Sequence, residues 1–236
     1  MSFDTTGIRL IAFDADDTLW DNQSLFDKAV ESYCRLLSCY GGEKAVFDSL
    51  YERECANMSS LGYGTKAFII SLVENAIKVS GGTVSNETLN RVVEIGREIL
   101  DNPATPLPGV YETLKTLKNK GLYRTVLFTK GDPLEQENKL ERSALGEFFD
   151  DVEIASNKTP VEYRRLCAHN NVPCSEFLMV GNSFKSDIAP VLEIGGKAVL
   201  ISFNQLWQHE VVEEYDHPNL LRLKEFSNLL DILCYG

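Results

Sequence analysis

The residues with the clearest chemical potential are Asp14 and Asp16, two acids spaced two positions apart at the end of an apolar run. The run, which begins at Ile8, is typical of a strand buried on both faces of a parallel sheet. In such sheets ligands bind beyond the carboxyl ends of the strands, where these acids would emerge. Two close carboxylates repel each other, so a cation or a phosphate-handling site would compensate them. An acidic surface turn is the structural alternative.

Two further polar segments also follow predicted strands. Thr129 offers a hydroxyl for a phosphate oxygen, and Gly131 allows the backbone to approach a ligand closely. Lys158 precedes residues 159–162, whose Thr-Pro-Val-Glu sequence predicts a capping box at a helix start. A cation beside a helix N-terminus can hold a phosphate. A simple polar turn and a solvated surface lysine are the structural alternatives.

The fourth polar segment contains Asn182 and Asp187, and it follows the apolar strand predicted at 177–181. An amide and a carboxylate across such a turn can complete the oxygen-only coordination that Mg²⁺ prefers. Asp187 could instead only cap the helix that it opens.

The elements that must position these residues follow from hydrophobic periodicity. Residues from about 24 to 102 predict four amphipathic helices, which a helical module can pack together. The proline-rich stretch 102–109 predicts a linker. Beyond it strands and helices alternate, which favours a doubly wound, Rossmann-like parallel α/β sheet. The five predicted strands cover residues 8–13, 123–129, 151–155, 177–181 and 198–202. We therefore expect an α/β core at 1–20 and 106–236 and a helical cap at 21–105, with 203–222 irregular and without an assigned role.

The composition narrows the possible partners. A net charge of −12 over 236 residues argues against binding of nucleic acid. We found neither an apolar stretch of membrane-spanning length nor a signal-like N-terminus, so we expect no membrane association and a cytoplasmic protein. The six cysteines and three histidines lack metal-ligand spacing, which favours reduced thiols over a zinc site or disulfides.

Taken together, the four polar segments resemble the motifs of the haloacid dehalogenase-like (HAD) superfamily, in its order and at its strand ends. The connecting sequences at 106–109 and 148–150 are similar to that family as well. The helices that follow the first motif resemble its small all-helical (C1) cap. The resemblance covers the whole core.

The resemblance implies a role for each residue at the strand ends. Asp14 would attack phosphorus and form an aspartyl-phosphate, while Asp16 would act as acid and then as base. Thr129 and Lys158 would hold the oxygens of the transferring phosphoryl group. Lys130 and Gly131 are expected to contact the substrate.

The resemblance also implies Mg²⁺ as the cofactor, held by the Asp14 carboxylate, the Asp16 carbonyl and Asp187. Asn182 stands where family members usually carry an aspartate, so we expect weaker affinity for Mg²⁺. Whether Asn182 or Asp187 contacts the metal directly stays open.

The expected function is hydrolysis of a small phosphorylated metabolite. A phosphomutase of the same fold is the nearest alternative, and a vestigial binding protein is another. Asp16 disfavours a haloacid dehalogenase, because that chemistry needs only a nucleophilic aspartate. Tyr63, in the glycine-flanked loop 58–65, either selects the substrate or packs inside the cap. The oligomeric state is left open.

Overall fold

The computed structural model describes residues 3–201 and 207–234, which divide into two compact units. An α/β unit contains Met1–Gln23, Ala104–Lys130 and Leu140–Gly236. A helical unit contains Ser24–Pro103 and Gly131–Lys139. The contacts thus group a segment after the second strand with the helices, and the sequence-based boundaries near 21 and 105 stay a prediction.

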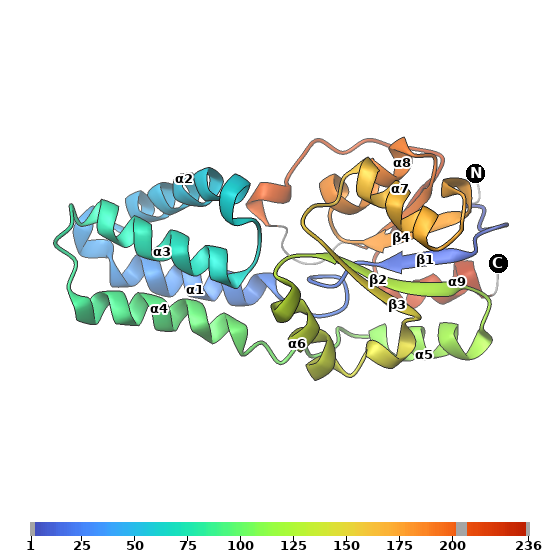
Figure 1. The fold of residues 1–236 in the computed structure, drawn as a ribbon, viewed down its shortest axis with the longest axis horizontal. Helices are drawn as coiled ribbons and strands as arrows, with labels where there is room; N and C mark the ends of the chain where they lie inside the picture. Colours follow the sequence, from blue (N-terminus) through green and yellow to red (C-terminus); the bar gives the residue numbers. More distant parts are fainter. Residues whose placement is uncertain (1–2, 202–206, 235–236) are drawn as a thin grey trace. The chain divides into compact units, whose positions relative to one another are not determined.

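The α/β unit is built on a parallel sheet in which the first strand is central. The order is β3-β2-β1-β4-β5-β6, and every neighbouring pair is parallel. Figure 1 labels β3, β2, β1 and β4 of this sheet. The strands are β1 Leu10–Phe13, β2 Arg124–Lys130, β3 Asp151–Ala155, β4 Phe177–Gly181, β5 Lys197–Ile201 and β6 Leu220–Leu223. The chain order switches on either side of β1, and ligands of such folds bind at that point, beyond the strand ends. The predicted α/β fold class is confirmed.

Alternate residues of β1 supply two separate hydrophobic cores. Leu10 and Ala12 belong to the core that contains residues of α7 and α8, whereas Ile11 and Phe13 belong to the core with α5 and α9. Figure 1 shows these helix pairs on opposite faces of the sheet. The helices are α5 Val110–Lys120, α7 Pro160–His169, α8 Ala189–Glu193 and α9 Leu229–Leu233. Burial on both faces explains why the β1 sequence is continuously apolar.

Three elements differ from the sequence-based expectation. The prediction of five strands is wrong, because β6 adds a sixth at the sheet edge; its four residues are too short to show a clear alternation. The helix predicted at 186–194 begins with a π-helical turn, Phe184–Ile188, before α8. The helix predicted at 224–234 is a 3₁₀ turn, Phe226–Asn228, followed by α9. Residue 202 of the predicted fifth strand, and residues 203–206, lie outside the described part.

The helical unit contains the four predicted amphipathic helices. They are α1 Gln23–Leu36, α2 Glu43–Leu61, α3 Thr65–Val79 and α4 Asn86–Leu100. Their apolar faces form one core of their own, and Ser85 caps α4 by accepting a hydrogen bond from the Thr88 amide at 3.0 Å. The N-terminal part of α6, Pro133–Ser143, belongs here too: Glu135 accepts hydrogen bonds from both the amide and the hydroxyl of Thr65.

Among residues 3–201 and 207–234, we find no helix with the length and hydropathy needed to cross a bilayer.

Candidate active site

A lysine ammonium joins two buried carboxylates that come from distant parts of the sequence. Lys158 Nζ donates to Asp14 Oδ1 at 2.5 Å and to Asp187 Oδ1 at 2.7 Å, and both partners lie almost out of solvent. Asp14 follows β1, Lys158 precedes α7, and Asp187 lies in the π-helical turn after β4. Three of the predicted catalytic or metal-ligating residues therefore meet at the carboxyl end of the sheet.

The local sequence explains the position of Lys158. Thr159 caps α7 by accepting a hydrogen bond from the Val161 amide at 3.3 Å, and Pro160 occupies the first helical position. The Thr159 hydroxyl also donates to the Glu162 carboxylate. The capping arrangement predicted from the sequence is thus present, and it starts the helix immediately after the lysine.

Burial and charge set the protonation behaviour of this triad. Burial raises the pKa of Asp14 to about 7, with Lys158 opposing the shift and Asp187 adding to it. Burial alone would lower the pKa of Lys158, but the attraction of Asp14 and Asp187 outweighs it and raises that pKa. One ammonium therefore compensates two buried carboxylates, and the site still favours additional positive charge.

Thr18 and Asn182 extend the site beyond the triad. The Thr18 hydroxyl lies 3.2 Å from Asp14 Oδ2, to which it donates, and 3.4 Å from Asn182 Oδ1. The Thr18 hydroxyl therefore links the Asn182 amide oxygen to the second carboxylate oxygen of Asp14. This placement explains the threonine two positions after Asp16 in the first motif.

The segment after β4 is shaped by a close approach between backbone and carboxylate. Asp187 Oδ2 accepts a hydrogen bond from the Ser183 amide at 3.0 Å. A Cβ atom at Gly181 would lie 2.3 Å from the same oxygen, so a side chain at this position would displace Asp187. Glycine is required here by space.

Asp16 is oriented by an aromatic neighbour in its own loop. Its Oδ1 accepts a hydrogen bond from the indole Nε1 of fully buried Trp20 at 2.7 Å. The intervening Asp17 has a positive φ of 61°, and its Oδ1 accepts from the backbone amides of Asn22 and Gln23 at the start of α1. Burial raises the pKa of Asp17 to about 7. The loop thus bends sharply after β1 and fixes the second acid.

The remaining predicted site residues are placed as follows. Thr129 is buried near the end of β2, beside β1, and Lys130 donates from Nζ to Ser186 Oγ at 2.9 Å and to the Glu210 carboxylate. Gly131 has a φ of +141°, and the space over its Cα is filled by Gln136. Tyr63 is half-buried in the helical unit. Contact of Lys130, Gly131 and Tyr63 with a substrate stays a prediction.

The donor atoms around Asp14 fit a magnesium ion. Asp14, Asn182 and Asp187 offer only oxygen, and Mg²⁺ commonly uses one or two carboxylates together with water and substrate phosphate. In the described part of the chain, no three His, Cys, Asp or Glu side chains are grouped as a metal site. Burial raises the pKa of Asp14 and the neighbouring Asp187 adds to that shift, so a bound cation would stabilise the ionised form of Asp14.

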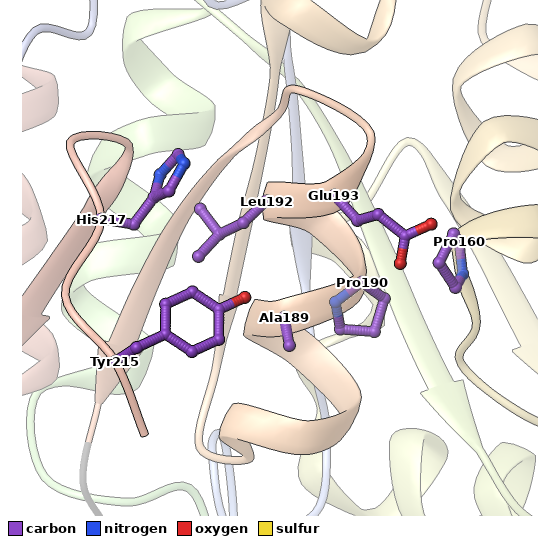
Figure 2. A pocket seen from close by; sticks show the side chains of 7 residues that line it. All are labelled: Pro160, Ala189, Pro190, Leu192, Glu193, Tyr215 and His217. Atoms are coloured by element: carbon purple, nitrogen blue, oxygen red, sulfur yellow. The ribbon is translucent and has the colours of Figure 1, made fainter. Parts of the chain in front are cut away.

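A cavity of about 380 Å³ lies elsewhere on the α/β unit (Figure 2). Its walls come from the start of α7, from α8 and from the segment before β6, namely Pro160, Ala189, Pro190, Leu192, Glu193, Tyr215 and His217. None of the predicted site residues lines it. The cavity is therefore distinct from the strand-end site.

Trp20 and Glu210 are examples of residues that contact the site but were not predicted as site residues from the sequence. Trp20 stands at the end of the first motif, but no spacing indicates a bond from its indole to Asp16. Glu210 lies in the segment that was expected to be irregular, and its contacts with Lys130, Ser183 and Ser186 are all distant in sequence.

Comparison with known proteins finds relatives that are named as phosphatases and hydrolases. It is 27% identical to a glyceraldehyde 3-phosphate phosphatase of Pyrococcus furiosus, over 96% of this chain and 93% of the relative. It is 33% identical to a crystallised haloacid dehalogenase-like family hydrolase of Xanthomonas campestris, with a TM-score of 0.85 and coverage of 94% and 88%. A magnesium-bound HAD hydrolase of Bacillus subtilis has the same fold, at 17% identity, a TM-score of 0.61 and coverage of 96% and 99%.

A family model, haloacid dehalogenase-like hydrolase, matches residues 8–195, which include Asp14, Thr129, Lys158 and Asp187. The resemblance inferred from the motifs and the prediction of a hydrolytic enzyme are therefore confirmed. The chain belongs to the haloacid dehalogenase-like hydrolases.

Proposed function

We propose that the protein is a Mg²⁺-dependent phosphatase that hydrolyses a small phosphorylated metabolite through an aspartyl-phosphate on Asp14. The observation that carries this proposal is the buried contact of Lys158 with both Asp14 and Asp187, beside a second acid at Asp16. The relatives named glyceraldehyde 3-phosphate phosphatase support a small phosphorylated substrate.

In the first step a carboxylate oxygen of Asp14 attacks the phosphorus atom and forms a phosphorus–oxygen bond. The bond from phosphorus to the substrate oxygen breaks, and Asp16 donates a proton to that leaving oxygen. Lys158 holds Asp14 and neutralises charge that grows on the phosphoryl oxygens, while the Thr129 hydroxyl donates to one of them.

In the second step Asp16, now ionised, accepts a proton from water as the water oxygen attacks phosphorus. The bond between Asp14 and phosphorus breaks, which releases inorganic phosphate and restores both acids. The hydrogen bond from Trp20 keeps the Asp16 carboxylate in one orientation during both proton transfers.

Asp14, Asp187, Asn182 and the Asp16 carbonyl would hold the magnesium ion, which when bound supplies positive charge against the repulsion between carboxylate and phosphate.

The presence of a carboxylate at Asp16 supports phosphate chemistry over dehalogenation, because phosphoryl transfer uses an acid and a base at this position and halide displacement does not. A phosphomutase would use the same residues and pass the phosphoryl group to a second hydroxyl. The relatives named phosphatases favour hydrolysis, and the experiment below separates the two.

The test is a screen of phosphorylated sugars, short phosphorylated acids, nucleotides and a generic aryl phosphate, with magnesium and with excess chelator. We expect release of inorganic phosphate that requires magnesium and that falls by at least about a thousandfold in Asp14→Asn. Isomerised substrate without free phosphate would indicate a mutase. Inactivity of the folded wild type on every compound would contradict the proposal.

A further inference from the structure

Glu210 is a buried carboxylate that contacts two sides of the strand-end site. It accepts hydrogen bonds from the ammonium of Lys130 and from the hydroxyls of Ser183 and Ser186, the last at 2.6 Å. Its side chain is 8% exposed. Lys130 follows Thr129 at the end of β2, whereas both serines lie on the segment that carries Asp187.

A chain of hydrogen bonds leads from Glu210 to Asp187. Ser183 donates from its hydroxyl to Glu210, accepts at that hydroxyl from the Ser186 amide at 3.0 Å, and donates from its own amide to Asp187 Oδ2. The other oxygen of Asp187 contacts Lys158. Glu210 thus contacts the turn that carries Asp187, and Lys158 links Asp187 to Asp14.

The charges are matched within this cluster. Burial alone would raise the pKa of Glu210, but Lys130 and the two serines outweigh it and lower that pKa, so the carboxylate is ionised at neutral pH. Lys130 Nζ also donates to Ser186 Oγ at 2.9 Å. The carboxylate therefore joins the end of β2 to the turn after β4 through one ionic and two hydroxyl contacts.

We propose that Glu210 is a positioning residue for phosphoryl transfer, which holds the Ser183–Asp187 turn and the Lys130 end of β2 in register around Asp14. This inference rests on the proposed phosphatase function. Residues that orient catalytic or metal-binding groups in this way commonly change activity by about 10- to 100-fold when they are removed.

The experiment compares Glu210→Ala and Glu210→Gln with Glu213→Gln, an exposed carboxylate three residues later in the same segment. With an aryl phosphate and saturating magnesium, we expect Glu210→Ala to lower kcat by about 10- to 100-fold while KM changes by less than about threefold. Glu210→Gln keeps an acceptor for both hydroxyls and should restore part of kcat. Glu213→Gln should match the wild type. Equal kcat in Glu210→Ala and Glu213→Gln would overturn the proposal.

Loss of Glu210 also removes a carboxylate partner of the Lys130 ammonium. The same substitution is therefore measured in a Lys130→Met variant, in which this charge is absent. In Lys130→Met, adding Glu210→Ala should still lower kcat, because the contacts of Glu210 with Ser183 and Ser186 are lost there as well. If it has no effect there, Glu210 only neutralises Lys130 and the positioning role is wrong.

A crystal structure of Glu210→Ala supplies a readout that does not depend on activity. We expect Asp187 Oδ1 to move out of hydrogen-bond distance of Lys158 Nζ; an unchanged contact would overturn the proposal. Inactivity of the wild type on all substrates would defeat the phosphatase function, and this structure would still decide the position of Asp187.

Discussion

Lys158 balances the charge of two carboxylates that would otherwise repel each other in the interior of the α/β unit. Removing one partner of a buried ion pair costs about 3–5 kcal/mol, because the other charge stays buried. The loss of stability should be smaller for Asp14→Asn, since the Lys158 ammonium keeps Asp187 as a partner. Under the proposed function, Asp14→Asn should therefore lose activity while it keeps its fold.

The hydrogen bond from Trp20 to Asp16 gives a prediction about the proposed general acid. Trp20→Phe removes the donor to Asp16 and should lower kcat/KM for an alkyl phosphate by about tenfold, because its leaving oxygen needs a proton. For a nitrophenyl phosphate, which leaves without much assistance, the loss should stay within about twofold. Steady-state kinetics on both substrates measure these losses, and equal losses of kcat/KM would contradict the proposal that Trp20 orients Asp16 as the acid.

The acidic and basic residues of the candidate site could be predicted from the sequence, whereas the residues that hold them in place could not. Asp14, Lys158 and Asp187 each follow or flank a strand end, and parallel strands bring those ends to one edge. Trp20 and Glu210 reach the site through side-chain directions that no periodicity encodes. Tertiary packing alone determines such contacts.

At the scale of elements, the segment from Gly181 through the π-helical turn determines where Asp187 lies. Gly181→Ala would place a Cβ 2.3 Å from Asp187 Oδ2, so we expect at least a tenfold loss of kcat and a loss of about 1–3 kcal/mol in the free energy of unfolding. Gly146→Ala is the matched control, because its nearest neighbour would be Leu140 Cγ at 3.8 Å. Kinetics and urea unfolding measure both effects; wild-type kcat in Gly181→Ala would refute the steric account.

Asp150 links α5 to the sheet and gives a pH-dependent prediction. Burial alone would raise the pKa of Asp150, but hydrogen bonds from Lys118 Nζ at 2.6 Å and the Thr125 amide at 2.8 Å outweigh it and lower that pKa. A carboxyl with a lowered pKa stabilises the fold above its unfolded pKa, near 4, and this contribution is lost as the pH falls through the folded value.

We therefore expect Asp150→Asn to lower the free energy of unfolding by about 1–2 kcal/mol at pH 7. The difference from the wild type should shrink as the pH falls from about 5 to 3, where the wild-type carboxyl becomes protonated. Urea unfolding across this range measures it. A difference that is constant with pH would show that the charge of Asp150 plays no part.

At the scale of the whole molecule, the fold class could be predicted because the hydrophobic periodicity, the helix caps and the order of the elements all indicated the same architecture. The four helical stripes and the alternating strands and helices predicted an α/β fold with a helical module. The edge strand β6 escaped prediction because four residues with one sheet neighbour leave little pattern. The grouping of Gly131–Lys139 with the helices depends on contacts such as Glu135 with Thr65, which are 70 residues apart.

The net charge of −12 also has a consequence at this scale. A dianionic phosphate approaches a protein that repels it on average, so attraction must come from local cations. Lys158 lies between two acids, and Lys130 contacts Glu210, so both ammonium groups are already partly neutralised. This balance explains why the proposed function includes a divalent cation.

The most direct test of the central claim is detection of the covalent intermediate. Asp16→Asn should slow hydrolysis of the aspartyl-phosphate more than its formation from a nitrophenyl phosphate, so the intermediate should accumulate. After an acid quench, peptide mass spectrometry should find one phosphoryl group on the peptide that contains Asp14, and none in Asp14→Asn. Release of phosphate by the wild type without such an adduct, or with the phosphoryl group on another residue, would contradict Asp14 as the nucleophile.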